Sequence, residues 1–183
     1  MSWRCNPSSI QIVACRRERG SGPTLSGLFG IKPMLAHDLE HYLHDHIPIS
    51  KAMQISVVEV QPLRVLLSAP LAPNINHRDT VFGGSASAVA ILAAWSLLHS
   101  RLLSEGMASR LVIQRNTMDY LRPIDGTFTA VAALENLDDW PLFLRMLTRK
   151  GKARITLVSE LHFRDQIAGR LEGEFVALGG VGV

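Results

Sequence analysis

A short polar loop directly precedes a pair of glycines, and this junction is where the sequence is best suited to chemistry. The loop holds Asn76, His77, Asp79 and Thr80, and the residues Gly83–Ser85 follow it and open a long apolar segment. An asparagine amide can hold a water molecule or a carbonyl oxygen, and a histidine can exchange protons near neutral pH. We therefore take the loop and the glycines after it as the candidate site.

The start of a helix can stabilise negative charge, because its first backbone N–H groups have no partner within the helix and lie at the positive end of its dipole. Gly83 and Gly84 would let a ligand approach this backbone without a Cβ in the way. Ser85 could be the N-cap or the first residue of the helix. We expect the Gly84 N–H to donate to a developing oxyanion. The alternative is that the two glycines only permit a tight turn into the helix.

The composition is typical of one globular domain. The chain has 183 residues, of which 47% are hydrophobic and 19% charged, enough for a sizeable core. Its net charge of +3 comes from residues 1–32, which carry a local net charge of +4. The remainder is near neutral, so we expect no nucleic-acid partner. Cys5 and Cys15 indicate neither a disulfide framework nor a zinc site, and they agree with a reducing cytoplasm.

The N-terminal stretch and the apolar segment bear on targeting. Residues 1–33 mix Arg, Ser, Gly and Pro, and we expect a disordered extension before a domain that spans residues 34–180. A transit peptide or a start codon placed too early are the alternatives. The best candidate for a membrane span, Ala86–Leu98, is interrupted by serines and is shorter than the roughly 20 residues that a bilayer requires. We therefore expect no membrane partner.

The elements that must position the loop follow from periodicity. Residues 34–46 have helical spacing, and Pro48 is expected to end that helix. Two β-branched segments on either side of Gln61-Pro62 predict strands. A helix apolar on most faces must be covered on most faces, so one curved antiparallel sheet should wrap the helix that follows the loop. The remaining expected elements are strands at 110–124 and 127–137, a short helix or arm closed by Gly151, and a hairpin that turns near Asp165-Gln166.

This order of elements, with Gly-Gly-Ser opening the central helix, resembles the hotdog fold, and more narrowly the YiiD C-terminal-domain family of thioesterases. The resemblance covers roughly residues 35–178 and rests on an ordered set of segments: HDHIPISKAMQISV, APLAPNINHRDTVFGGS, ILAAWSLL, MDYLRPIDG and RKGKARITLVSEL. It implies an α+β fold, with a curved antiparallel sheet around a central helix. It also implies a homodimer or a tetramer, active sites between subunits, and acyl-thioester substrates carried on coenzyme A without any other cofactor.

The resemblance also implies a role for the first loop residue. In hotdog thioesterases of the phenylacetyl-CoA type, an asparagine stands six residues before the histidine of a His-Gly-Gly turn. Asn76 matches that asparagine, which would hold the water or the thioester oxygen, and Phe82 replaces the histidine. The alternative for Asn76 is an asparagine that closes its own turn. Thr80 could donate to the substrate or cap the turn.

The sequence departs from that type on the central helix. Thioesterases of the phenylacetyl-CoA type carry an acidic residue on this helix where the present sequence has Ile91. No Asp or Glu occurs between Gly83 and Glu105. A carboxylate base must come from elsewhere or be absent. As candidates for the base we rank Asp79 before His77. For both residues the alternative is a solvated loop position without a catalytic role. Asp119, on the following strand, is a further source from the same or the partner chain.

Two further clusters contain residues that could bind anions or metals. The segment RMLTRKGKAR includes Arg149, Lys150 and Lys152, which could bind the phosphates of coenzyme A; a solvated basic turn is the alternative. His37 and His41 have a spacing that can bind a metal. A polar helix face explains them better, so we expect no metal.

The resemblance thus implies a hydrolase that acts on acyl-CoA or a related thioester. One alternative is a hydroxyacyl-thioester dehydratase on the same fold, and the missing helix acid argues against it. Another is an acyl-CoA-binding module without catalysis, which the missing acid favours. The fold alone does not decide among them.

Overall fold

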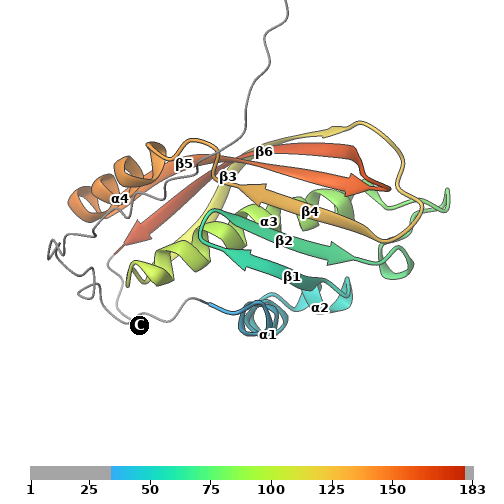
Figure 1. Ribbon diagram of the computed structural model, residues 1–183, viewed down its shortest axis with the longest axis horizontal. Coiled ribbons are helices and arrows are strands. Elements are labelled where there is room, and N and C mark those ends of the chain that lie inside the picture. Colours follow the sequence, from blue (N-terminus) through green and yellow to red (C-terminus); the bar gives the residue numbers. More distant parts are fainter. Residues whose placement is uncertain (1–33, 180–183) are drawn as a thin grey trace, which may run out of the picture. The chain divides into compact units, whose positions relative to one another are not determined.

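The computed structural model describes residues 34–179, in which helices and strands pack around one long helix (Figure 1). The expected N-terminal extension lies outside the described residues, and the domain boundaries stay a prediction. The helices are α1 (Ala36–His46), α2 (Pro48–Ala52), the 3-10 helix η1 (Ala72–Asn74), α3 (Gly83–Ser104) and α4 (Asp139–Lys150). The strands are β1 (Ser56–Gln61), β2 (Arg64–Ala69), β3 (Ser109–Tyr120), β4 (Phe128–Ala133), β5 (Lys152–Phe163) and β6 (Gln166–Gly179).

The six strands form one antiparallel sheet in the order β1-β2-β4-β5-β6-β3. β5 and β6 join through a tight turn in which Arg164 and Asp165 both adopt left-handed backbone angles, with φ of 48° and 58°. This turn lies one residue earlier than the sequence predicted. β3 pairs only with β6, so one edge of the described sheet is a strand of 12 residues.

The core lies between the sheet and α3, which runs along the concave face of the sheet (Figure 1). Strand β5 shows why, because its side chains alternate between the two faces. Ala153, Ile155 and Leu157 are buried toward α3, whereas Lys152 and Arg154 are exposed on the outer face. The predicted α+β arrangement, a curved antiparallel sheet around a long central helix, is confirmed.

Two boundaries differ from the sequence-based expectation. α1 ends before Pro48 as expected, with Ile47 as its C-cap, but Pro48 then begins the unexpected helix α2, because a proline suits the first position of a helix, where its missing N–H costs nothing. α3 has 22 residues, and by length and composition it could cross a membrane, although 61% of its most apolar window is buried within the fold. The helix therefore extends beyond the Ala86–Leu98 run on which the expected absence of a span was based.

Candidate functional site

The loop between η1 and α3 is a small closed unit. Ile75 and Val81 form an isolated antiparallel bridge. Within it, the Asn76 N–H donates to the Thr80 carbonyl at 2.8 Å, and the Asp79 N–H donates to the Asn76 carbonyl at 3.3 Å. Asp79 adopts a left-handed φ of 58°, which a short polar side chain tolerates. The chain thus reverses within the loop and enters α3 from a fixed direction.

The Asn76 side chain is engaged within this loop at both ends of its amide. Its Nδ2 donates to Thr80 Oγ1 at 3.0 Å and to the Val81 carbonyl at 3.3 Å. Its Oδ1 accepts from the Arg78 N–H at 2.7 Å and from the Thr80 N–H at 3.4 Å. Asn76 therefore closes its own turn, and Thr80 is its partner in doing so. These bonds fix the shape of the loop that a substrate would meet.

A second asparagine, Asn74, anchors the loop and was not singled out from the sequence. Its side chain is 1% exposed, and its Nδ2 donates to the carbonyls of Met53 at 3.0 Å and Pro70 at 2.8 Å. Its own carbonyl accepts from the Phe82 N–H at 2.7 Å. Residue type alone cannot distinguish this buried asparagine from the half-exposed Asn76, because both stand in the same polar run.

The first turn of α3 leaves backbone donors free. Phe82 is the N-cap, and no side chain caps the helix. The first helical bond runs from the Ala86 N–H to the Phe82 carbonyl at 3.0 Å. Within the described residues, the N–H groups of Gly83, Gly84 and Ser85 therefore have no protein partner, as expected for a helix start. Ser85 is the third helical residue, so the interpretation of it as N-cap or first residue was wrong: Phe82 already has the extended backbone of an N-cap.

Two exposed aromatic rings flank the glycines. Tyr120, at the end of β3, donates its hydroxyl hydrogen bond to the Gly83 carbonyl at 3.0 Å. A Cβ at Gly83 would stand 3.4 Å from the Tyr120 ring, an ordinary contact, whereas a Cβ at Gly84 would overlap the Phe82 ring. A side chain at position 84 would therefore have to displace the exposed Phe82 ring, which packs on the Gly84 Cα. Tyr120 was missed from the sequence, where it is only the last residue of a strand pattern.

A pocket of about 340 Å³ opens beside this helix start. Its walls are mostly apolar. The polar side chains among them are Tyr120 and Arg122, and the Arg122 guanidinium donates to Gln166 Oε1. Gly83, the first of the three residues with a free N–H, lies in the pocket lining, and Gly84 and Ser85 follow it in the helix. No carboxylate belongs to its described lining, which includes Val81, Gly83, Ala86, Tyr120, Leu121 and Ile124.

The predicted acids and bases lie around this pocket at different positions. His77 and Asp79 are exposed in the loop. Asp119 is exposed and paired across from Arg170 on β6. Because side chains alternate along a strand, Asp119 points to the opposite face of the sheet from Tyr120. Within one chain the structure therefore does not bring Asp119 to the start of α3.

The basic cluster lies at the other end of the sheet from the pocket. Arg149 and Lys150 end α4, and Lys152 begins β5. Leu161, which lines the pocket, follows nine residues later on the same strand, a separation of roughly 30 Å. Lys150 and Lys152 border a groove of about 830 Å³ between α4 and β5. Within one chain, the cluster and the helix start are not brought together.

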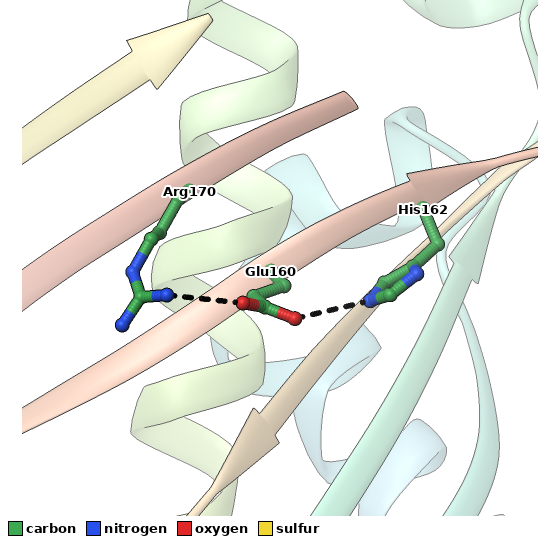
Figure 2. A network of polar contacts seen from close by, with 3 residues as sticks. All are labelled: Glu160, His162 and Arg170. Carbon is green, nitrogen blue, oxygen red and sulfur yellow. Dashed lines mark hydrogen bonds and ion pairs between the residues drawn. The ribbon is translucent and has the colours of Figure 1, made fainter. Parts of the chain in front are cut away.

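A polar network on β5 and β6 is also separate from the pocket (Figure 2). Glu160 contacts Arg170 at 3.3 Å and His162 at 3.4 Å. Glu160 alternates with Ser159 and Leu161, which are buried toward α3. The network therefore lies on the outer face of the sheet, away from the free N–H groups.

The histidines of α1 do not form a metal-binding group. The rings of His37 and His41 lie 4.3 Å apart, and His44 Nε2 bonds the Ile55 carbonyl at 2.8 Å. Between residues 34 and 179, no group of three or more His, Cys, Asp or Glu side chains could hold a metal ion. The expectation that the protein needs no metal stays a prediction.

The family comparison agrees with this geometry. The model of the family described as "Putative thioesterase (yiiD_Cterm)" matches residues 36–179, which is well over half of the chain. The chain belongs to this family. As a member of it, the protein has a thioesterase-like fold, and its family membership implies a thioester substrate.

Solved structures share the fold. A protein of unknown function from Chlorobaculum tepidum has 26% sequence identity and a TM-score of 0.75, with 81% of this chain and 99% of that chain covered. A "putative thioesterase" from Shewanella oneidensis has 25% identity and a TM-score of 0.71, with 78% and 96% covered. The PaaI protein of the E. coli phenylacetic acid degradation operon has 18% identity and a TM-score of 0.60, with 81% and 99% covered. The last of these shows the fold alone, and the predicted hotdog fold is confirmed.

Proposed function

We propose that the protein hydrolyses acyl thioesters of coenzyme A at the start of α3. The observation that carries the proposal is the uncapped first turn of this helix, whose free N–H groups begin at Gly83, a residue that lines a pocket with mostly apolar walls. A thioester needs a polarised carbonyl, and unpaired N–H groups at the positive end of a helix dipole supply it. The apolar walls suit the acyl group.

In the proposed reaction, the thioester oxygen accepts from the Gly84 N–H, with the N–H groups of Gly83 and Ser85 beside it. A water oxygen attacks the carbonyl carbon and loses a proton, and the resulting oxyanion is stabilised by these donors. The C–S bond then breaks, and the thiolate leaves and takes up a proton. Asn76 steers the water, either directly or through the loop that it closes, and Phe82 packs against the acyl chain.

The group that accepts the proton from water is proposed to come from the loop. Asp79 is our first candidate and His77 our second, because both are exposed beside the helix start. Thr80 supports them by holding Asn76. Neither a cofactor nor a metal takes part in this proposal, and we place the reaction in the cytoplasm, where both cysteines would stay reduced.

We also propose that the protein is a homodimer in which Arg149, Lys150 and Lys152 serve the partner's site. A phosphopantetheine arm has about thirteen bonds from sulfur to phosphorus and reaches roughly 15 Å, half the separation within one chain. If two copies of β3 pair antiparallel about the middle of the strand, Tyr120 of one copy meets the Ser109 end of the other. The backbone of Lys152 then lies three strand spacings away along the sheet, roughly 14 Å. The free β3 edge, on which Val112 is 43% exposed, supports this pairing.

An acyl-CoA-binding module without catalysis is the second candidate, and the observation that favours it is the absence of a carboxylate from the described pocket lining. A dehydratase has less support, because the histidine and acid that it would need do not face each other across this pocket.

The deciding experiment is thiol release from a panel of acyl-CoAs, from acetyl to long-chain and aromatic, by the full-length protein. Release above the uncatalysed rate for some member is expected and would also give the acyl preference. Binding seen by calorimetry, with no release from any member, would reject the hydrolase in favour of the binding module. Acyl-N-acetylcysteamine, which lacks the phosphates, should be turned over with a higher KM.

A further inference from the structure

We infer that Tyr120 is a positioning residue, whose hydroxyl fixes the peptide group between Gly83 and Gly84 so that the Gly84 N–H points toward the substrate. The inference rests on the proposed function and adds a second element, β3, to the site. Tyr120 bonds the Gly83 carbonyl oxygen, so in this role it acts on the substrate through the backbone.

The geometry of a single peptide group carries the argument. The Gly83 carbonyl and the Gly84 N–H belong to the same planar, trans peptide unit. Fixing the direction of the carbonyl therefore fixes the direction of the N–H, which points the opposite way, out of the helix start. The 3.0 Å bond from the Tyr120 hydroxyl holds this carbonyl from outside the helix.

The regular helical bond already engages the Gly83 carbonyl, and the Tyr120 hydroxyl adds a second restraint at a place where the backbone is otherwise permissive. The peptide group lies between two glycines, which have the widest backbone freedom, in the first turn of a helix, where fraying is greatest. Phe82 at the N-cap offers no polar side chain. Within the described residues, the Tyr120 bond is the one side-chain hydrogen bond to this turn.

Tyr120 is itself held in place. It pairs with Gly169 on β6, and the next two N–H groups, those of Leu121 and Arg122, both donate to the Ala168 carbonyl at 2.9 and 3.1 Å. The tyrosine therefore connects the rigid sheet to the free end of α3. A hydrogen bond to a carbonyl also polarises the N–H of the same peptide, which makes it a better donor.

The ring and the hydroxyl of Tyr120 have separable roles. The ring lines the pocket, and it should affect substrate binding. The hydroxyl bonds only the Gly83 carbonyl among the described residues, so it should affect the transition state. Tyr120→Phe removes the second role and keeps the first.

The experiment compares Tyr120→Phe with Tyr42→Phe, the same change at the other tyrosine of the chain. With an acyl-CoA that the wild type hydrolyses, we expect Tyr120→Phe to lower kcat about three- to tenfold and to leave KM within about twofold. These values are expected when one hydrogen bond that stabilises the transition state is lost. The amide proton of Gly84 should move upfield in the NMR spectrum. Tyr42→Phe should change neither. Matching melting temperatures would show that both variants fold.

An active wild type with an unchanged kcat in Tyr120→Phe would overturn the inference and leave the proposed function standing. A rise in KM with kcat unchanged would also overturn it, because the hydroxyl would then act on binding. A wild type inactive on the whole panel would reject the proposed function. The Gly84 amide shift would still test the positioning in that case, and an unmoved signal would overturn it.

Discussion

Single hydrogen bonds give the loop before α3 its shape, and Asn76 makes more of them than any neighbour. Its amide bonds Thr80, Val81 and the Arg78 N–H, so the loop and the start of α3 depend on one side chain. A residue of this kind affects turnover whether it touches the water or only holds the loop.

Asn76→Ala is expected to lower turnover by about ten- to a thousandfold, as for loss of an oxyanion-type contact. It should also lower the melting temperature, because the loop loses bonds at both ends of the amide. Thr80→Val is the matched control, since it removes only the hydroxyl partner and should cost less in both measurements. Thiol release and thermal melting of the three proteins test this. An Asn76→Ala protein with the wild-type rate would remove Asn76 from the mechanism.

His99 shows a different residue-scale effect, in an aromatic stack between α1 and α3. Its ring stacks on Trp95 at 4.5 Å and lies against Tyr42 at 4.6 Å. Its Nε2 is buried without a hydrogen-bond partner in the described part of the chain. Burial, and then the nearby His46, lower the pKa of His99 from 6.5 to about 4. The folded protein therefore keeps this histidine neutral.

The pH dependence of stability follows from this lowered pKa. Well above pH 6.5 His99 is neutral in both the folded and the unfolded state, and the full stability is present. As the pH falls from 6.5 toward 4, the unfolded chain binds the proton and the folded chain does not, so the free energy of unfolding decreases. His99→Phe keeps an aromatic ring in the stack and should remove this part of the loss. Urea denaturation of both proteins at pH 7 and 4.5 tests it; equal losses in the two would contradict the assignment.

At this scale the sequence predicted the loop but not the roles within it. It identified Asn76, Thr80 and Gly84 because polar types next to glycines are visible in the letters. It did not identify Asn74 or Tyr120, because their roles depend on burial and on a contact between residues 37 positions apart. Neither property leaves a local pattern.

Among the elements, α4 illustrates how a helix end is set by one residue. Gly151 follows α4 with a left-handed φ of 64°, and its N–H donates to the Leu147 carbonyl at 2.8 Å. A Cβ at Gly151 would meet only the Gly179 carbonyl, at 3.8 Å. There is room for a side chain at this position. Glycine is favoured because of the left-handed backbone conformation.

Gly151→Ala should destabilise the protein by about 1 kcal/mol, the cost of a left-handed alanine. Gly151→Asn should cost less, since asparagine tolerates this conformation. Chemical denaturation of the two variants separates these values. An alanine variant as stable as the wild type would show that the end of α4 has relaxed into another conformation.

The order and type of the elements could be predicted because periodicity reports burial directly. The boundaries were less predictable, as Pro48 and Ser85 show. A proline such as Pro48 can follow the end of one helix and begin the next. Ser85 was favoured as the start of α3 because serine is a common N-cap. The true N-cap, Phe82, has no such signal, because its role rests on its extended backbone and on its carbonyl, which accepts the first helical bond from the Ala86 N–H.

For the whole molecule, the distance between the basic cluster and the helix start is the main constraint. They lie roughly 30 Å apart in one chain, which a phosphopantetheine arm cannot bridge. The proposed dimer shortens the path by making each site from two chains. The family resemblance already implied sites shared between subunits, but the sequence alone could not say which strand would pair the two copies, since that depends on which strand lies at the free edge of the sheet.

Mixing two defective variants tests the shared site. Asn76→Ala disables the loop, and the double variant Lys150→Glu, Lys152→Glu disables the cluster; each homodimer should lose at least about tenfold in kcat/KM. In a heterodimer, one site combines the intact loop of one chain with the intact cluster of the other. The purified heterodimer should therefore regain about half of the wild-type rate, since one of its two sites is whole.

The control is Lys51→Glu, an exposed charge reversal on α2, far in sequence from the cluster. It should leave activity near the wild-type value and should not alter the rescue. If the cluster acted within its own chain, each chain of the heterodimer would carry one defect in its own site. The mixture would then be no more active than its parents. Rescue to half activity arises only when the loop and the cluster of one site belong to different chains, so this measurement decides the arrangement without knowledge of the acyl group.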